Sequence, residues 1–290
     1  MSALPALSVV VSTRDRPSAL ARCLDALASQ TEASALDVVV VDDGSKQASA
    51  VGEVVANCPQ ARLLRTDHGG VAGARNAGAR AARAPLIAFT DDDCIPARDW
   101  AAELLRAFDA GPAAVAGRTE NGSGNRFDAA TQAVTEEFTR SALGTPPLTA
   151  FGAGSNLSCR QEVFDAVPFD AERYFRRAGE DRDWCGRLLA AGFQLVSEPA
   201  AVVYHQQGLD LRRFLAKHIR YGRGAYLVRS GSPRPAPLPS SFYLGLLRRG
   251  FALGPLTGLL VAVSQLATLV GFAQEALAAD RKRSRVKPAK

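Results

Sequence analysis

The chain has 290 residues, of which 47% are hydrophobic and 22% charged, values typical of a globular protein with one large domain or two small ones. Its formal net charge of +6 is concentrated in residues 281–290, which carry six Lys or Arg and no acid. The remaining 29 basic residues balance 29 acidic ones, which excludes a general basic surface, and we expect no nucleic-acid partner.

The cysteines are odd in number and include no Cys-x-x-Cys pair. They are Cys23, Cys58, Cys94, Cys159 and Cys185. This pattern indicates reduced, mostly buried thiols in a cytosolic protein. Residues 1–7 lack the charged and apolar regions of a signal peptide, so we expect no export signal there.

Short apolar runs alternate with helical patterns in the first part of the chain. The predicted strands are 7–11, 36–41, 62–65 and 86–89, and the predicted helices between them are 20–30, 48–56 and 69–83. Strands that alternate with helices favour an α/β fold, in which a mostly parallel sheet is covered by helices on both faces.

The pattern continues less regularly up to residue 208. Helices are predicted at 100–108, 128–143, 160–166 and 180–192, and strands at 113–116, 193–196 and 201–204. Residues 118–126 are rich in Gly and Asn, so we expect a mobile loop there.

The character of the sequence changes beyond residue 208. A basic helix with aromatic residues is predicted at 211–229, and four prolines make 230–241 a stiff linker. Residues 250–274 carry no charge and are long enough to enter the hydrocarbon core of a membrane. The predicted division is 1–208 for the α/β domain, 209–229 for the basic helix, 230–241 for the linker and 242–290 for a membrane-associating segment with its basic tail.

Three consecutive carboxylates, Asp91, Asp92 and Asp93, follow the apolar run 86–89. Asp91 and Asp93 share a side of a near-extended backbone. Burying such like charges is costly unless a cation compensates them, so a hard divalent metal that also holds substrate phosphates is favoured. The alternative is a solvated acidic turn, but ligands of α/β sheets bind where strands end.

Other acidic or glycine-rich motifs lie at predicted element edges, and together they resemble those of a family 2 glycosyltransferase with the GT-A fold. The resembling segments are 9–14, 40–45, 70–78, 89–96, 154–157 and 179–181. They lie within residues 7–205, and the first half is the more specific. The resemblance implies that 1–208 is a GT-A (Rossmann-like) catalytic domain.

The resemblance also implies a UDP-, dTDP- or GDP-sugar donor. Asp43 would accept the ring imide N–H of the base, Thr13 and Arg14 would line the base and ribose, and Arg75 would face the donor's anionic parts. Asn156 would bond to the diphosphate or the acceptor. The alternatives are a turn-forming Asp43 before glycine, a solvated helical Arg75 and a turn residue at Asn156.

For the reaction centre, the resemblance implies a Mg²⁺ or Mn²⁺ cofactor held by Asp93, with Asp91 at the ribose or metal and His205 as a further ligand. Asp181 would be the general base of an inverting in-line displacement, with Glu180 orienting the acceptor. The alternatives are a structural His205, and acidic residues that merely complement a helix N-terminus.

The expected acceptor is a sugar, a glycan or a lipid-linked molecule in cell-envelope, polysaccharide or glycolipid synthesis. Because nucleotide-sugars are cytosolic, we expect the enzyme at the cytoplasmic face of the membrane, with 250–274 spanning, re-entering or lying on the bilayer. Two other hypotheses are a membrane-tethered, non-catalytic nucleotide-sugar binder and a phosphatase with an Asp nucleophile.

Overall fold

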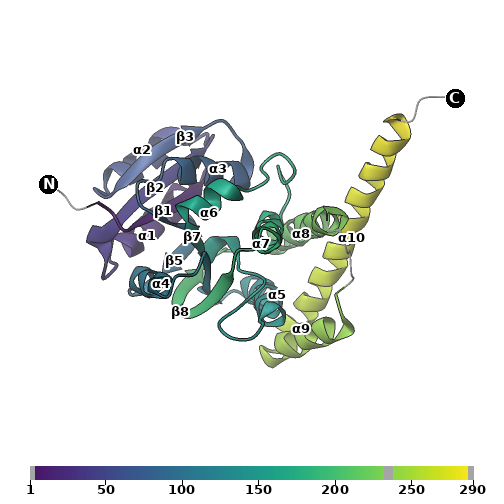
Figure 1. The fold of residues 1–290 in the computed structure, drawn as a ribbon. Coiled ribbons are helices and arrows are strands. Elements are labelled where there is room, and N and C mark those ends of the chain that lie inside the picture. The colour runs from purple at the N-terminus through teal and green to yellow at the C-terminus, as the bar shows by residue number, and fades with distance from the viewer. Residues whose placement is uncertain (1–3, 232–237, 287–290) are drawn as a thin grey trace. The chain divides into compact units, whose positions relative to one another are not determined.

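A computed structural model describes residues 4–231 and 238–286 (Figure 1). The chain forms two compact units. The first comprises the residues up to 123 together with 139–175 and 181–207, and the second comprises 124–138, 176–180 and the residues from 208 onward. Each unit therefore draws on segments that are far apart in the sequence.

The first unit is built on a mixed, eight-stranded sheet with the spatial order β3-β2-β1-β4-β7-β6-β8-β5. The strands are β1 (Leu7–Thr13), β2 (Leu36–Asp43), β3 (Ala61–Thr66), β4 (Leu86–Asp91), β5 (Cys94–Pro96), β6 (Ala114–Asn121), β7 (Leu157–Arg160) and β8 (Leu195–His205). Parallel pairing joins β3, β2, β1 and β4.

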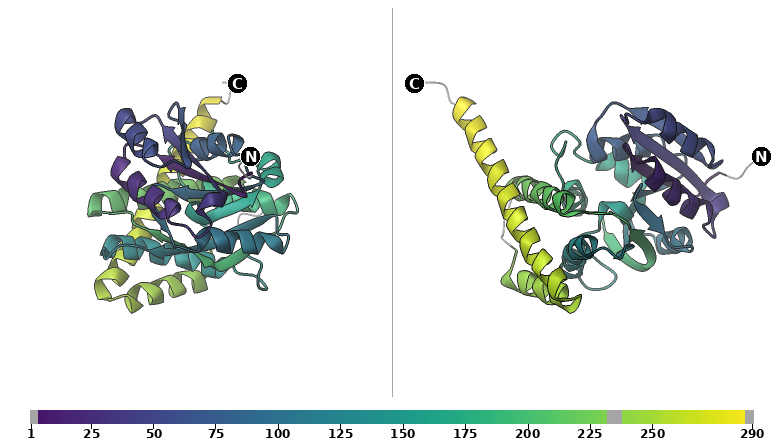
Figure 2. Two further views of the ribbon diagram at one scale, coloured as in Figure 1. Left: turned by 90° about the vertical axis from the view of Figure 1, so that its left-hand side faces the viewer. Right: turned by 180° about the vertical axis from the view of Figure 1, so that it is seen from behind.

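Helices pack on both faces of these parallel strands (Figures 1 and 2). One face carries α1 (Pro17–Ala28), α2 (Ala48–Ala56) and α4 (Trp100–Asp109), and the other carries α3 (Gly70–Arg80), α6 (Gln161–Ala166) and α7 (Glu180–Ala190). The residues of β1 and β2 are buried along their whole length, which explains their continuous apolar runs. The predicted α/β fold is confirmed.

The second half of the sheet departs from the predicted elements. β7 pairs antiparallel with β4 and β6, and the three-residue β5 pairs antiparallel with β8. Residues 118–121, expected in a mobile loop, continue β6 because they pair with 202–205 of β8. The two strands predicted at 193–196 and 201–204 form one strand, β8. Two short 3-10 helices, η1 (Ala33–Ala35) and η2 (Gly154–Asn156), complete this unit.

The second unit is helical, with α8 (Leu211–Gly231), α9 (Ser240–Ala252), α10 (Pro255–Val286) and most of α5 (Arg126–Ala142). Its apolar core takes side chains from all four helices. They include Ala133, Phe214, Phe242, Leu246 and Val261.

Two predictions for this region change. Residues 230–231 and 240–241 of the predicted linker are helical, and 232–237 lie outside the described residues. The apolar run 250–274 is divided between α9 and α10 at Gly254, whose φ of 120° suits glycine. Of the described helices, one has a segment long and apolar enough to cross a membrane, Pro255–Arg281. Its most apolar 18-residue window has a mean hydropathy of 1.8, and 33% of that window is buried.

Candidate active site

The candidate site lies at the carboxyl edge of the parallel strands. In the register of the sheet, Thr13 of β1 is opposite Asp42 of β2, and Ser12 of β1 is opposite Asp91 of β4. The ends of β2, β1 and β4 are therefore neighbours in space. The predicted residues Asp43, Thr13 and Asp91 follow one another along one edge of the sheet.

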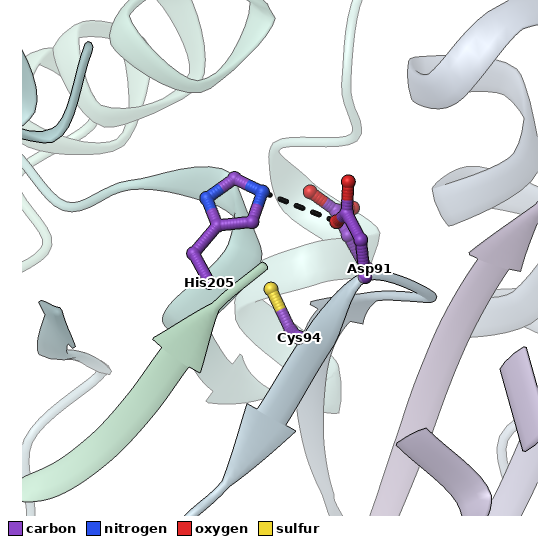
Figure 3. A group of neighbouring side chains, drawn as sticks. Asp91, Cys94 and His205 are labelled. Atoms are coloured by element: carbon purple, nitrogen blue, oxygen red, sulfur yellow. Dashed lines mark hydrogen bonds and ion pairs between the residues drawn. The ribbon is translucent and has the colours of Figure 1, made fainter. Parts of the chain in front are cut away.

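A turn after β4 brings a second strand end to the same place. Asp92 and Asp93 form the turn into β5, and Cys94 of β5 is opposite His205, the last residue of β8. One ligand atom each from Asp91, Asp93, Cys94 and His205 lies within 4.8 Å of the others. Figure 3 shows the His205 imidazole beside the carboxylates at the end of β4, and its dashed line marks the contact between His205 Nε2 and Asp93 Oδ1. We call Asp91, Asp93 and His205 the sheet-edge cluster.

The sheet-edge cluster suits a divalent metal. Its two carboxylates are the oxygen ligands that Mg²⁺ and Mn²⁺ prefer, and an imidazole nitrogen is an additional ligand for a transition metal. His205 Nε2 lies 3.1 Å from Asp93 Oδ1, so the two side chains are already close enough to bind the same ion. Burial, followed by the charges of Asp93 and Asp91, raises the pKa of the Cys94 thiol. A buried, protonated thiol is a poor ligand for a hard cation, so Cys94 is not included.

Asp92, the middle carboxylate, faces the protein interior. It is fully buried, accepts a hydrogen bond from Thr13 Oγ1 at 2.7 Å and pairs with Arg16 Nη2 at 2.5 Å. Burial raises its pKa to about 7, with Arg16 opposing and Asp93 reinforcing the shift. The second amino group of Arg16 reaches Asp93 Oδ2 at 2.7 Å. Asp92 therefore braces the turn.

Sequence reasoning did not single out Arg16. The available signal was its place in the polar loop after the first strand, which ends at the same sheet edge as the carboxylates. A loop cation at that edge is positioned to balance acidic residues on the neighbouring strand. Its guanidinium group bridges Asp92 and Asp93.

The predicted base-binding end centres on Asp43. Its carboxylate accepts the N–H groups of Gly69 at 2.7 Å and Gly70 at 2.9 Å, at the start of α3, where the helix dipole favours an anion. His68 Nδ1 lies 2.9 Å from Asp43 Oδ2, and the His68 ring lies 5.4 Å from that of Phe175. Arg14 Nη1 is 2.6 Å from His68 Nε2. His68, for which no role was predicted, thus links two predicted donor residues.

Arg75 is buried instead of solvated, with only 2% of its side chain exposed. Its Nη2 donates to Asp91 Oδ1 at 2.9 Å, and its guanidinium carbon lies 5.7 Å from the centre of the Phe169 ring. A side chain at Gly154 would collide with this guanidinium group, so the glycine gives it room. Arg75 is therefore placed to fix the orientation of Asp91.

Two predicted donor-binding residues have their side chains engaged inside the protein. The Thr13 hydroxyl donates to Asp92, as described above. Asn156 is 1% exposed, accepts the indole N–H of Trp100 at 2.8 Å and donates both amide protons, to the carbonyl oxygens of Arg118 and Ala201. We therefore assign the Asn156 side chain to the support of β6 and β8 instead of to the donor, because no amide proton remains for a ligand.

The predicted base, Asp181, lies in the first turn of α7 and is half-buried. Its Oδ2 accepts the N–H of Gly154 at 3.2 Å, and its Oδ1 accepts the N–H of Arg182 at 2.8 Å. These bonds fix the direction of the carboxylate. Glu180, the preceding residue, is 7% exposed and belongs to the helical unit. The roles of both residues stay predictions.

With this geometry established, the sequence itself gives the class of the protein. Residues 8–167 match the family described as Glycosyl transferase family 2. The chain belongs to this family, as the motifs predicted, and the phosphatase hypothesis is set aside.

Individual relatives of the chain are also named as glycosyltransferases. The chain is 32% identical over 270 residues to a pre-mycofactocin glycosyltransferase of Mycobacterium tuberculosis, covering 89% of this chain and 56% of the relative. It is 30% identical over 283 residues to an N-acetylglucosaminyltransferase of Bradyrhizobium diazoefficiens. That match covers 92% of this chain and 57% of the relative. The chain thus spans little more than half the length of these two relatives.

A solved structure has a similar fold. It is the mannosyltransferase PcManGT of Pyrobaculum calidifontis in complex with GDP-Man and Mn²⁺, at a TM-score of 0.62 and 21% identity. The similarity covers 96% of this chain and 81% of the other. At this level of identity the comparison supports the GT-A-like fold alone.

Proposed function

We propose that this protein transfers a sugar from a nucleotide-diphosphate donor to an acceptor hydroxyl at a membrane surface. The observation that carries the proposal is the convergence of Asp91, Asp93 and His205 at the sheet edge, in a chain of glycosyltransferase family 2. The UDP-, dTDP- and GDP-sugars remain the candidate donors. The region 1–208 would then be the catalytic domain and 209–290 its membrane-facing extension.

The order of the strands supports one direction for the donor. Neighbouring strands lie about 4.8 Å apart, so β2 and β4 are separated by about 10 Å across β1. A nucleotide laid across this edge would place its base near Asp43, its ribose near Arg14 and the end of β1, and its diphosphate near Asp91 and Asp93. That length suits a nucleoside diphosphate in an extended conformation.

The base would have to compete for Asp43. Its carboxylate already faces Gly69 N–H, Gly70 N–H, His68 and, at 3.4 Å, the Thr66 hydroxyl. A carboxylate offers about four acceptor positions, so a base imide N–H would replace one of these donors. His68 is the natural candidate because 27% of its side chain is exposed.

Mg²⁺ or Mn²⁺ would be held by Asp91, Asp93 and His205, and it would supply positive charge against the diphosphate leaving group. The chain's own cations complement this arrangement. Arg75 holds Asp91 in place, and Arg16 holds Asp93 and Asp92. Both carboxylates of the sheet-edge cluster would therefore be preoriented before the donor arrives.

On the acceptor side, Asp181 would remove the hydroxyl proton as that oxygen attacks the anomeric carbon in line with the departing diphosphate. The Gly154 N–H holds one carboxylate oxygen in a fixed direction. Glu180 would orient the acceptor. The expected stereochemical outcome is inversion, because a single displacement has no covalent sugar–enzyme intermediate.

The membrane part of the proposal concerns exposed apolar side chains on α9 and α10. They are Tyr243, Leu244, Leu247, Phe251, Leu256, Leu259, Leu266, Leu269, Val270 and Leu277. The middle of α10 packs closely on α8, where a side chain at Gly222 would collide with the backbone of Thr268 and Phe272. The neighbouring Arg220 and Arg223 of α8 would be drawn into the bilayer if α10 crossed it, at high cost.

We therefore propose that α9 and α10 lie along the membrane surface at its cytoplasmic face. The exposed Arg212, Arg213 and Arg248 would face anionic headgroups.

The decisive experiment measures thermal unfolding of the full-length protein with Mn²⁺ and a panel of UDP-, dTDP- and GDP-sugars. A ligand at 100 times its Kd stabilises by about 2.7 kcal/mol, so one nucleotide class should raise Tm clearly. Release of the nucleoside diphosphate is then measured with glycan and lipid-linked acceptors. Failure of every nucleotide-sugar to stabilise the protein would refute the proposal. Binding without release across all acceptors would favour the non-catalytic binder.

A further inference from the structure

The backbone before the proposed base follows an unusual path. The Arg176–Glu180 segment belongs to the helical unit and leads directly into Asp181. Arg176 has a φ of 58°, a left-handed conformation that is uncommon for a residue with a side chain, and Gly179 has a φ of 98°. Such conformations persist where surrounding contacts impose them. Two other elements of the helical unit, α8 and α10, provide contacts of this kind.

One set of contacts comes from α8. The backbone of α8 approaches the segment so closely that a side chain at Gly224 would collide with the carbonyl group of Ala178. Val228, one turn further along α8, lies beside Gly179. The segment thus rests directly on the backbone of α8, with little room to adjust.

A second set comes from α10, through a buried carboxylate. Glu275 Oε1 lies 2.8 Å from Arg177 Nη2 and 2.9 Å from Arg177 Nε, and its Oε2 lies 2.8 Å from Arg223 Nε. Only 7% of the Glu275 side chain is exposed. Although burial alone raises the pKa of Glu275, hydrogen bonds and charges from Arg177 and Arg223 lower it overall. The group is thus an ionised anchor between the segment, α8 and α10.

The two helices that provide these contacts are themselves locked together (Figures 1 and 2). A side chain at Gly271 of α10 would collide with the carbonyl group of Ile219, and one at Gly222 of α8 with that of Thr268. The rings of Tyr226 and Phe272 meet edge to face at 5.4 Å. Reciprocal close contacts of this kind leave α10 no freedom to slide along α8.

We propose that Glu275 is a positioning residue for catalysis, which holds the Arg176–Glu180 segment through Arg177 and thereby fixes the start of α7, where Asp181 lies. The inference rests on the proposed function, because that function assigns Asp181 the role of general base. It assigns the apolar C-terminal helices a second role besides membrane association: they support the acceptor-side catalytic group. A misplacement of about 1 Å at such a group can cost about a hundredfold in rate.

The test compares two full-length variants that each lose one buried or half-buried carboxylate charge in the same unit. Glu275→Gln keeps the shape of the side chain and removes the charge that holds Arg177. Glu136→Gln is the matched control, because Glu136 pairs with Arg249 at 2.8 Å, between α5 and α9, away from the segment. Arg177→Met is a third variant, since it cuts the link to the segment while Arg223 and Glu275 still join α8 to α10.

Glu275→Gln and Arg177→Met should lower kcat about 10- to 100-fold and leave the KM for the donor and the affinity for Mn²⁺ unchanged. Glu275→Asp should recover part of kcat. Hydrogen exchange of residues 176–180 should accelerate in Glu275→Gln and Arg177→Met and stay at the wild-type rate in Glu136→Gln. Unchanged kcat in Glu275→Gln, or a loss no larger than in Glu136→Gln, would overturn the proposal.

The exchange measurement separates this proposal from the proposed function. If the wild-type protein transfers no sugar, the proposed function fails, and faster exchange in Glu275→Gln would still show that Glu275 holds the segment. If the wild type is active and neither exchange nor kcat responds, the positioning role fails alone. If Glu275→Gln does not fold, kcat and hydrogen exchange of Arg177→Met test the positioning role instead.

Discussion

Two acidic centres of the molecule differ in how their charge is balanced. In the first unit, Asp91, Asp92 and Asp93 meet the guanidinium groups of Arg16 and Arg75, so carboxylates outnumber permanent cations. In the helical unit, the single carboxylate of Glu275 meets two guanidinium groups, those of Arg177 and Arg223. The first centre has more carboxylates than permanent cations, an excess that a further cation would offset, whereas the carboxylate of Glu275 is outnumbered by its cations.

This difference suggests how to distinguish acidic residues that bind a ligand from those that hold a structure. Both kinds are at least partly buried and hydrogen-bonded, so burial alone does not separate them. The balance of charge does, because an excess of buried charge is costly unless a ligand completes it. Changes in the first unit should therefore reduce chemistry at nearly constant stability, and changes in the helical unit should act on stability, positioning or membrane binding.

The largest effect is expected for Asp181→Asn, which keeps the shape of the side chain but cannot accept a proton at neutral pH. We expect kcat to fall by about two to four orders of magnitude, with the donor Kd and Tm nearly unchanged. Steady-state kinetics and a donor titration would measure this. Near-normal turnover would mean that Asp181 only completes the first turn of α7.

The next largest effect is expected for Asp93→Asn, which removes one carboxylate of the sheet-edge cluster. Mn²⁺ affinity, measured by calorimetry on the protein without donor, should fall about a hundredfold or more. Chelation of the wild type should abolish transfer, and either Mg²⁺ or Mn²⁺ should restore it. Asp109→Asn, an exposed acid at the end of α4, serves as the control. Full activity in excess chelator would remove the metal from the mechanism.

A stability effect is expected in the helical unit at His218. This residue is fully buried, and its Nε2 forms a hydrogen bond with Thr131 Oγ1. Burial, assisted by the charge of Lys217, lowers its pKa from 6.5 to about 3. Below pH 6.5 the unfolded chain binds a proton that the folded protein does not, so stability falls with falling pH until about pH 3. The loss amounts to about 1.4 kcal/mol per pH unit.

Between pH 7 and pH 5 this contribution alone is about 2 kcal/mol. His218→Gln should lack it, so the difference in unfolding free energy between wild type and variant should shrink by that amount on acidification. Urea denaturation at several pH values would measure the two curves. Parallel curves would show that His218 titrates normally in the folded protein.

The smallest effect is expected at the exposed apolar surface of α10, which we propose to face the membrane. Replacing Leu266 and Leu269, which are 63% and 64% exposed, by Gln should weaken binding to anionic vesicles about tenfold or more. Tm should change little, because neither side chain is in the core. Leu143→Gln, an exposed leucine of the first unit, is the control. A full-length protein that stays in solution beside such vesicles would contradict the membrane proposal.

The sequence predicted well what depends on local pattern. The buried strands around Val39 and Ile87, and the carboxylates that follow them, were found because continuous apolar runs end abruptly in polar residues. The placement of Asp91 and Asp93 on one side followed from strand geometry, and His205 joined them only through the family resemblance. The structure brings the three together.

What the sequence could not predict depends on partners that are distant along the chain. The three residues of β5 form a strand only because β8 pairs with them, and residues 118–121 do so despite their loop-like composition. Asn156 was expected at the ligand from its motif alone. The motif contains no information about Trp100, which lies 56 residues away and donates to the Asn156 side chain. The pairing of Glu275 with Arg177, 98 residues away, was likewise absent from any local pattern.

The five free cysteines are all buried, and Cys94 is the first residue of β5, opposite His205 of the sheet-edge cluster. Alkylating reagents can reach such a sulfur only when the structure around it opens locally, so the labelling rate of Cys94 reports how often this edge of the sheet opens. Mass spectrometry distinguishes its peptide from those of Cys23, Cys58, Cys159 and Cys185. The wild-type chain thus contains a built-in probe of its candidate site. If a nucleotide-sugar binds there, the alkylation rate of Cys94 should fall.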